Sequence, residues 1–183
     1  MIPVNNEIHL EILSESHALL IFATIDSQRE YLRKWLPFID ASKKVEDTLF
    51  FIRQTANSPD KDTTYVIFYQ NEFAGLAGLK ATDYANKRTE IGYWLSESLQ
   101  GKGIVTSVCK KLIAIAFGEM GMNRVQIRMA VENEKSCAVA KRLGFTFEGI
   151  ESDGELLLSG FTDIRVYSLL KREILNYETY KLA

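Results

Sequence analysis

Cysteine and histidine are scarce in this chain, which has two of each among its 183 residues. Cys109 and Cys137 form neither a C-x-x-C pair nor a disulfide framework, which fits a reducing cytosol. His9 and His17 both lie near the N-terminus, and no G-x-S-x-G motif is present, which argues against a hydrolase triad. No group of cysteine, histidine and carboxylate residues has the spacing of metal ligands, so we expect no metal site.

The chain also lacks a long apolar run and an excess of charge of one sign. No apolar stretch approaches the roughly 20 residues needed to cross a bilayer, and residues 1–7 do not look like a secretory signal. With 22 basic and 24 acidic residues, the formal net charge is −2, too balanced to predict a nucleic-acid surface. We therefore expect a cytoplasmic protein with neither a membrane nor a nucleic acid among its partners.

Ordinary composition and unbroken patterning predict one domain over residues 1–183, with residues 171–183 as a charged, peripheral tail. Apolar residues at every second position predict strands, and apolar residues three and four apart predict helices. The expected strands are Glu7–Leu13, Thr63–Tyr69, Phe73–Thr82, Thr89–Leu95, Val125–Val131, Phe145–Glu151 and Phe161–Leu170, and the expected helical stretches are Ser16–Leu36, Val45–Ala56, Lys102–Met120 and Glu134–Leu143. This order predicts an α/β (α+β) fold whose sheet has antiparallel and parallel parts.

A turn that contains two glycines joins the strand ending at Leu95 to the helix that follows. Its sequence is Gln100-Gly101-Lys102-Gly103-Ile104-Val105-Thr106. A helix start carries free N–H groups and the positive end of the macrodipole, so it suits a phosphate, and glycines let a ligand approach the backbone. The frame matches neither a P-loop nor a dinucleotide-binding fingerprint. A plain connecting loop is the alternative interpretation.

This turn and three other segments resemble the GNAT acyltransferase superfamily. The other segments are Glu90-Ile91-Gly92-Tyr93-Trp94-Leu95, Asn133-Glu134-Lys135-Ser136 and Leu143-Gly144-Phe145. In the family's phosphate-binding motif Gln100 and Gly103 match, whereas Val105 replaces a small residue and would crowd a pyrophosphate without removing its amide. The resemblance extends to Leu170 and implies a single GNAT-like domain, with a mixed, central-splayed sheet flanked by helices. It is closest to the branch that acetylates N-terminal amines of ribosomal proteins.

The resemblance implies that the chain binds acetyl-CoA. The residues expected to bind this cofactor are Leu95, Gln100, Gly101, Lys102, Gly103, Val105, Thr106 and Asn133. The pyrophosphate would lie on the amides of residues 100–106, and the pantetheine arm would lie between the strands that end at Leu95 and Val131. A backbone amide near Leu95 would hold the oxyanion.

Ser136 and Glu155 are the residues expected to move protons. By its position in the first turn of a helix, Ser136 fits a capping arrangement with Asn133, whereas the resemblance implies that it returns a proton to the CoA thiolate. The resemblance also makes Glu155 the general base, with a solvated acidic loop around Asp153 as the alternative. If that segment is extended, Glu151, Asp153 and Glu155 share one face.

Other side chains support less specific interpretations. Glu90 lies on the strand beside the cofactor cleft and is either a rival base or an ion-pair partner. The aromatic residues Tyr31, Trp35 and Phe38 fit a core, with the wall of an acceptor pocket as the alternative. The pair Lys141-Arg142 is typical of a solvated helix end.

The resulting hypothesis is transfer of an acetyl group from acetyl-CoA to a primary amine by direct attack on the thioester. We expect the acceptor to be a protein or peptide N-terminus. A small amine such as a polyamine or an antibiotic is one alternative, and a CoA-binding module without turnover is another. A homodimer is expected from the resemblance alone.

Overall fold

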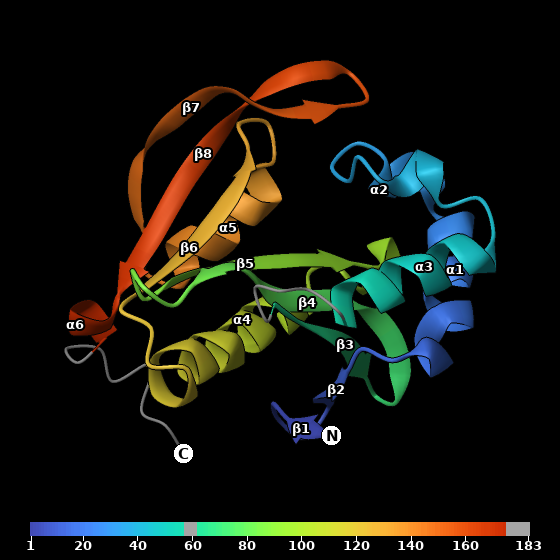
Figure 1. Ribbon diagram of the computed structural model, residues 1–183, viewed down its shortest axis with the longest axis horizontal. Coiled ribbons are helices and arrows are strands. Elements are labelled where there is room, and N and C mark those ends of the chain that lie inside the picture. The colour runs from blue at the N-terminus through green and yellow to red at the C-terminus, as the bar shows by residue number, and fades with distance from the viewer. Residues whose placement is uncertain (57–61, 175–183) are drawn as a thin grey trace.

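The computed structural model describes residues 1–56 and 62–174, in which eight strands form one sheet (Figure 1). The strands are β1 (Ile2–Pro3), β2 (Ile8–Ile12), β3 (Thr63–Tyr69), β4 (Glu72–Asp83), β5 (Arg88–Leu95), β6 (Arg124–Ala130), β7 (Thr146–Leu157) and β8 (Gly160–Leu170). They lie in the order β1-β2-β3-β4-β5-β6-β8-β7, and all neighbours are antiparallel except the parallel pair β5 and β6. The predicted mixture of antiparallel and parallel parts is confirmed.

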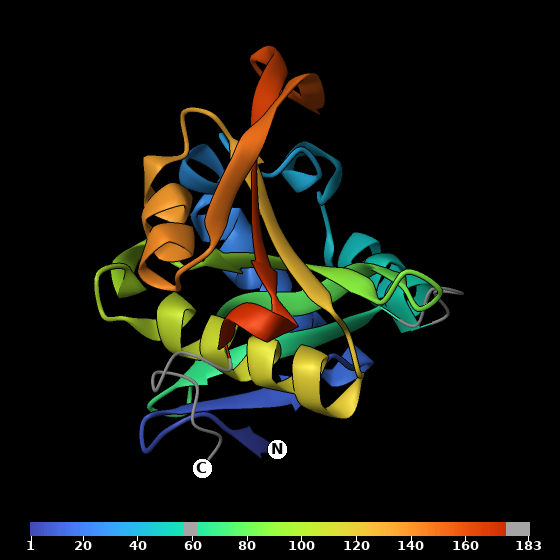
Figure 2. The same ribbon diagram turned by 90° about the vertical axis from the view of Figure 1, so that its left-hand side faces the viewer.

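The sheet splits between its two parallel strands. β5 and β6 pair only where residues 88–90 lie beside residues 124–126. Past this segment β5 stays paired with β4 as far as Leu95, and β6 stays paired with β8 as far as Ala130. Figures 1 and 2 show β6, β7 and β8 leaning away from β5. The two halves of the sheet therefore diverge, which is the splay that the family resemblance implies.

Helices pack on both faces of the larger half of the sheet. The helices of the described residues are η1 (Glu15–His17), α1 (Ala18–Ser27), α2 (Arg29–Leu32), η2 (Ile39–Ala41), α3 (Val45–Ala56), η3 (Glu97–Leu99), α4 (Ile104–Ala114), the π-helical η4 (Ile115–Glu119), α5 (Glu134–Arg142) and α6 (Lys171–Ile174). Successive strand residues face opposite ways, so Trp94 belongs to the core beneath α1 and α3, and Leu95 belongs to the core beneath α4. In Figure 2 α4 and the N-terminal helices lie on opposite sides of these strands.

The helical character expected over Ser16–Leu36 is confirmed, and the stretch divides into the separate helices η1, α1 and α2. Gln28 leaves the helical conformation at a φ of −131°. Its side chain donates a hydrogen bond to Ser96 Oγ and accepts one from the Glu97 N–H, each at 2.8 Å. These contacts with a distant segment end α1, and the apolar spacing alone does not reveal them.

Two other boundaries differ from the sequence prediction by more than one residue. The helix expected from Lys102 begins at Ile104, because Gly103 has a left-handed φ of +74°. β7 continues to Leu157, beyond the expected end at Glu151. The helix at Val45–Ala56 is confirmed, and its expected stop at residues 57–60 lies outside the described residues.

The described part of the C-terminal tail is α6, at which Lys171 Nζ donates a hydrogen bond to the Phe117 carbonyl oxygen at 2.9 Å. Residues 175–183 lie outside the described part of the chain. Over the ranges 1–56 and 62–174, no helix has the length and apolar character needed to cross a membrane.

Candidate active site

The turn before α4 presents backbone N–H groups to a ligand. Gly101 and Gly103 have φ values of +76° and +74°, which glycine adopts without the steric cost of a Cβ. Gly103 is the N-cap of α4, and no side chain among the described residues caps that helix end. A Cβ built on either glycine would meet no atom within 4 Å, so open space lies beside both. Since the first N–H groups of a helix have no partner inside it, this turn can hold an anion.

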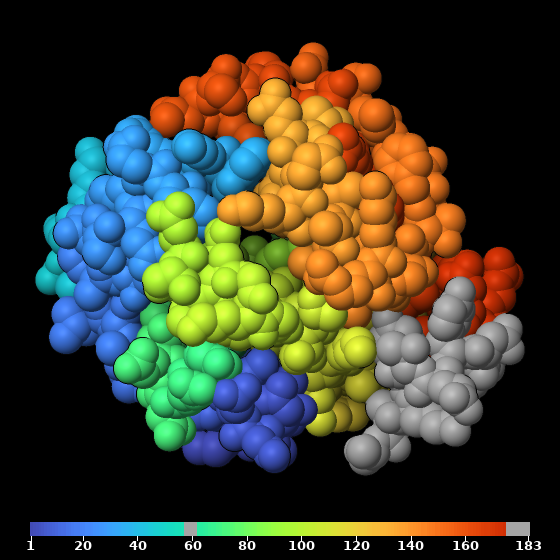
Figure 3. All heavy atoms as spheres, turned by 180° about the vertical axis from the view of Figure 1, so that it is seen from behind, coloured from blue at the N-terminus to red at the C-terminus, as the bar shows by residue number. Residues whose placement is uncertain are grey.

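A cavity of about 910 Å³, the first cavity, opens beside this turn. Its wall comes from α2 and the loop after it, the end of β5, the glycine turn, the start of α4, and α5. The expected cofactor residues that line it are Leu95, Gln100, Gly101, Gly103, Val105, Thr106 and Asn133. Lys102 is not brought to it, because its ammonium lies over the Tyr69 ring, 5.2 Å from the centroid. Figure 3 shows the hollow where these blue, yellow-green and orange segments meet.

Arg142 adds a positive charge to the first cavity. The basic pair it belongs to predicts a solvated helix end, yet Arg142 lines the cavity and its Nη1 donates a hydrogen bond to Thr106 Oγ1 at 2.9 Å. The guanidinium therefore lies beside the N-terminus of α4, where a pyrophosphate would bind. The sequence pattern gives no sign of this contact, because α4 and α5 meet only in the folded chain.

Replacing Arg142 with alanine is expected to weaken acetyl-CoA binding about tenfold, because a charge-assisted hydrogen bond to a phosphate would be lost. At saturating acetyl-CoA, kcat should stay the same, since Arg142 would contact the cofactor far from the reacting carbonyl. Calorimetry with the Arg142→Ala and Lys141→Ala variants measures this effect, since Lys141 carries the same charge outside both cavities. Equal losses in the two variants would contradict a specific role for Arg142.

Gln100 connects two walls of the first cavity. Its side-chain amide donates a hydrogen bond to the Tyr31 hydroxyl of α2, and its carbonyl oxygen accepts one from Lys135 Nζ of α5. Burial raises the pKa of Tyr31, so this phenol stays protonated near neutrality. Tyr31 and Lys135 join the expected cofactor residues only through the fold, and local sequence contains no signal for either.

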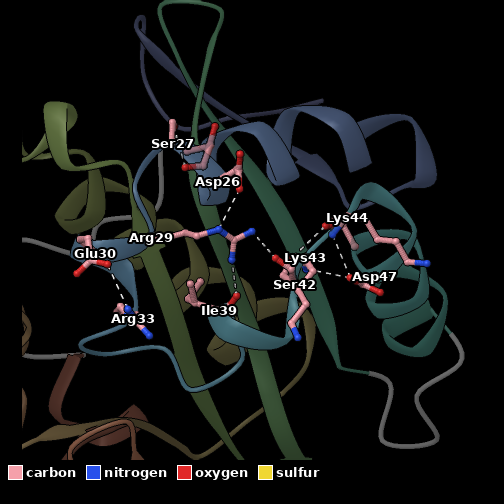
Figure 4. A network of polar contacts seen from close by, with 12 residues as sticks. Asp26, Ser27, Arg29, Glu30, Arg33, Ile39, Ser42, Lys43, Lys44 and Asp47 are labelled. Atoms are coloured by element: carbon pink, nitrogen blue, oxygen red, sulfur yellow. Dashed lines mark hydrogen bonds and ion pairs between the residues drawn. The ribbon is translucent and has the colours of Figure 1, made fainter.

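The loop after α2 is held in place by Arg29 (Figure 4). Its guanidinium donates hydrogen bonds to Asp26 at 2.9 Å, to the Ile39 carbonyl oxygen at 2.8 Å, and to the Ser42 carbonyl oxygen. The loop between these contacts carries Trp35, which lines the first cavity and also a second one. Both interpretations of the aromatic residues have support, since Tyr31 and Trp35 pack against buried core clusters and also line a cavity.

The second cavity, of about 700 Å³, lies on the other side of the splay. The two cavities share the wall residues Trp35, Leu36, Tyr93, Trp94, Asn133 and Ser136. Of these two cavities, Phe38 and Glu155 line the second and not the first. The fold therefore brings the two expected proton-moving residues, Ser136 and Glu155, to one space, although they lie 19 positions apart in the sequence.

Carboxylates of the second cavity differ in their partners. Glu90 is buried and forms ion pairs with Lys80 at 3.0 Å and with Arg128 at 3.8 Å. Asp62 accepts hydrogen bonds from two backbone N–H groups of the strand β4. Within residues 1–56 and 62–174, the Glu155 carboxylate has no side-chain or backbone partner of this kind. Glu155 is thus the carboxylate left available to an incoming amine, and Glu90 fits the ion-pair interpretation.

The acidic face expected from Glu151, Asp153 and Glu155 is interrupted at Asp153. β7 is bulged between Glu151 and Glu155, which pair with Ile164 and Thr162 of β8 respectively, and Asp153 has a φ of +50°. The bulge interrupts the alternation of side chains that the prediction assumes. Glu151 instead pairs with Arg128. The bulge leaves Glu155 alone of the three in the second cavity.

The position of Ser136 is compatible with both of its expected roles, in the capping of α5 and in catalysis. Asn133 is the N-cap of α5, and its Oδ1 accepts a hydrogen bond from the Ser136 backbone N–H at 3.1 Å. The capping arrangement is therefore present, and it uses the backbone of Ser136 while the residue still lines both cavities. Cys137 is buried and its sulfur lies 3.2 Å from the Tyr167 hydroxyl, which fits a packed side chain.

The backbone at the end of β5 offers a donor to the space between the cavities. The Ser96 N–H donates a hydrogen bond to the Ala74 carbonyl oxygen of β4 at 2.8 Å. Because N–H groups alternate in direction along a strand, the Leu95 N–H is directed toward the opening between β5 and β6. This is the position expected for an amide that holds an oxyanion.

Comparison with known proteins gives consistent similarities. Residues 7–146 match the Acetyltransferase (GNAT) domain. YdaF of Bacillus subtilis (strain 168), provisionally assigned as a ribosomal N-acetyltransferase, is 36% identical over 178 residues, which cover 93% of this chain and 94% of that protein. RimL, a ribosomal L7/L12 α-N-protein acetyltransferase solved with coenzyme A, is 30% identical with a TM-score of 0.88 over 92% of this chain and 97% of its own. MccE, a microcin C7 self-immunity acetyltransferase solved with acetyl-CoA and AMP, is 34% identical with a TM-score of 0.85 over 91% and 94%.

Proposed function

Because the chain belongs to the GNAT acetyltransferase family, we propose that it acetylates the N-terminal α-amine of a protein, of the kind that ribosomal-protein acetyltransferases modify. Membership makes it an acetyl-CoA-dependent N-acetyltransferase, as the segments around Gln100 and Ser136 predict. The acceptor is supported by similarity to YdaF and RimL over 93% and 92% of the chain. A cytoplasmic location belongs to the same proposal, since such acceptors are made there.

The observation that carries the proposal is the meeting of two cavities at Ser136. The first has the residues that acetyl-CoA needs: a glycine turn with open space beside it for the pyrophosphate, and Arg142 as a nearby cation. The second has aromatic walls for an acceptor and a carboxylate, Glu155, that is unpaired within the part of the chain that the structure describes. A donor in one cavity and an amine in the other would meet at their shared wall.

Direct attack on the thioester is the mechanism that this arrangement supports. Glu155 takes the proton of the attacking amine, the Leu95 N–H stabilises the oxyanion, and the Ser136 hydroxyl donates a hydrogen bond to the departing sulfur. The C–N bond forms, the C–S bond breaks, and the chain itself carries no covalent intermediate. An α-amine has a reference pKa of about 7.7–8.0 against about 10.4 for lysine, so an N-terminus is the easier acceptor near neutrality.

Matched acceptors test the proposal. We expect acetylation of a peptide with a free N-terminus and no lysine, and little reaction with the same peptide when its N-terminus is blocked and one lysine is added. Release of CoA thiol measures the rate, and mass spectrometry locates the acetyl group. Reaction with spermidine alone would favour a small amine as acceptor, and acetyl-CoA binding without any transfer would favour a sensing module. The homodimer stays a prediction that sedimentation equilibrium would test.

A further inference from the structure

Tyr93 places a buried hydroxyl at the junction of the two cavities. It lies on β5 past the last residue that pairs with β6, and it lines both cavities together with Ser136. Among the described residues its Oη is enclosed and forms no hydrogen bond. Buried hydroxyls are nearly always paired, because an unmade hydrogen bond costs stability. An unpaired hydroxyl at this point therefore indicates that its hydrogen bond forms during the reaction.

The surroundings of this hydroxyl keep it a donor. Burial raises the pKa of Tyr93 well above its usual range, and the nearby thiols of Cys109 and Cys137 act in the same direction. The Ser136 side chain lowers the pKa of Tyr93 as a hydrogen-bonding neighbour, so the two hydroxyls lie close together, although Oη forms no complete hydrogen bond among the described residues. The phenol thus keeps its proton at every pH at which an amine is acetylated.

A hydrogen bond from such a donor would orient the Ser136 hydroxyl. The pKa of an alcohol is close to that of water, about 15.7, whereas that of a thiol is about 8.5, so a departing thiolate cannot strip the serine of its proton. Ser136 stabilises the sulfur only while its O–H is directed at it. A serine hydroxyl rotates freely, and a hydrogen bond received on Oγ restricts where its own hydrogen points.

We propose that Tyr93 is a positioning residue of the acetyl transfer, whose hydroxyl donates a hydrogen bond to Ser136 Oγ when the substrates are bound and so directs the serine hydrogen at the leaving sulfur. This rests on the proposed function of Ser136. Tyr93 transfers no proton: the amine proton goes to Glu155, and the thiolate leaves under the Ser136 hydrogen bond and is protonated by water.

The Tyr93→Phe variant tests the proposal through two readouts of opposite sign. Removing an unpaired buried hydroxyl should raise the Tm of the free protein by about 2–4 °C. The same change should lower kcat about tenfold, with the acetyl-CoA dissociation constant unchanged by calorimetry. In the Ser136→Ala background, adding Tyr93→Phe should lower kcat no further, because the two hydroxyls act as one unit.

Tyr65→Phe is the matched control. Tyr65 is buried on the same face of the sheet, since both Tyr65 and Tyr93 pair with Ala77 from opposite sides, and it lines neither cavity. Its kcat should equal that of the wild type. An unchanged kcat in Tyr93→Phe, a lower Tm, or a loss that adds to that of Ser136→Ala would each overturn the proposal. Failure of the wild type to acetylate any amine would instead refute the proposed function, and the Tm comparison would still stand.

Discussion

Glu155→Gln is expected to lower kcat/KM for a peptide α-amine about 100-fold at pH 6 and far less above pH 8. With a reference pKa near 8, only about one α-amine in a hundred is neutral at pH 6, so a base must remove the proton from the rest. The carboxamide keeps the shape of the side chain but cannot accept that proton. Above the amine pKa most acceptor molecules are already neutral, and the loss shrinks. A pH–rate profile between pH 5.5 and 9 measures the effect.

Glu90→Gln is the matched control, since Glu90 is a carboxylate of the same cavity with different partners. Its ion pairs with Lys80 and Arg128 give it a structural role, so its loss should lower the free energy of unfolding and leave the shape of the pH profile unchanged. A wild-type profile in Glu155→Gln would show that Glu155 is not the base. The loss at low pH appearing in Glu90→Gln instead would transfer that role to Glu90.

The first cavity was the more predictable part of this site, because its chemistry depends on neighbouring residues. The glycine turn and the start of the helix, with Gly101, Gly103 and Thr106, are a short continuous segment of the sequence. A strand followed by glycines and a helix has free backbone N–H groups at the start of that helix, whatever the rest of the chain does. The splay was predictable only through the family resemblance. Nothing in the alternation of β5 or β6 indicates that their pairing ends after residues 90 and 126.

The remaining parts depend on contacts between distant segments, which no local pattern encodes. Arg142 is one of several basic residues at helix ends and becomes a cavity residue only because α5 lies beside α4. The isolation of Glu155 depends on the bulge in β7 at Asp153 and on the ion pair that Glu151 forms with Arg128. In the sequence, Tyr93 has the pattern of an ordinary strand residue. Its hydroxyl becomes buried, without a hydrogen-bond partner among the described residues, only because α4 and α5 pack around it in the fold.

Ser136→Ala is expected to lower kcat about 100-fold while acetyl-CoA binds as tightly as to the wild type. The serine hydroxyl acts on the sulfur only when negative charge develops there, so its loss raises the barrier without weakening the ground-state complex. Steady-state kinetics with a peptide acceptor measures kcat, and calorimetry measures the dissociation constant. Equal kcat values in the variant and the wild type would remove Ser136 from the mechanism.

The structure allows this loss to be assigned to the hydroxyl rather than to a damaged helix. Asn133 caps α5 through the backbone N–H of residue 136, which alanine retains, so Ser136→Ala should leave stability nearly unchanged. Asn133→Ala is the complementary control: it removes the cap, should cost about 1 kcal/mol of stability, and leaves the hydroxyl in place. If Ser136→Ala destabilised the protein as much as Asn133→Ala does, the serine would be a capping residue and its effect on kcat would be indirect. A large kcat loss at wild-type stability is the result that only a hydroxyl acting on the leaving sulfur predicts.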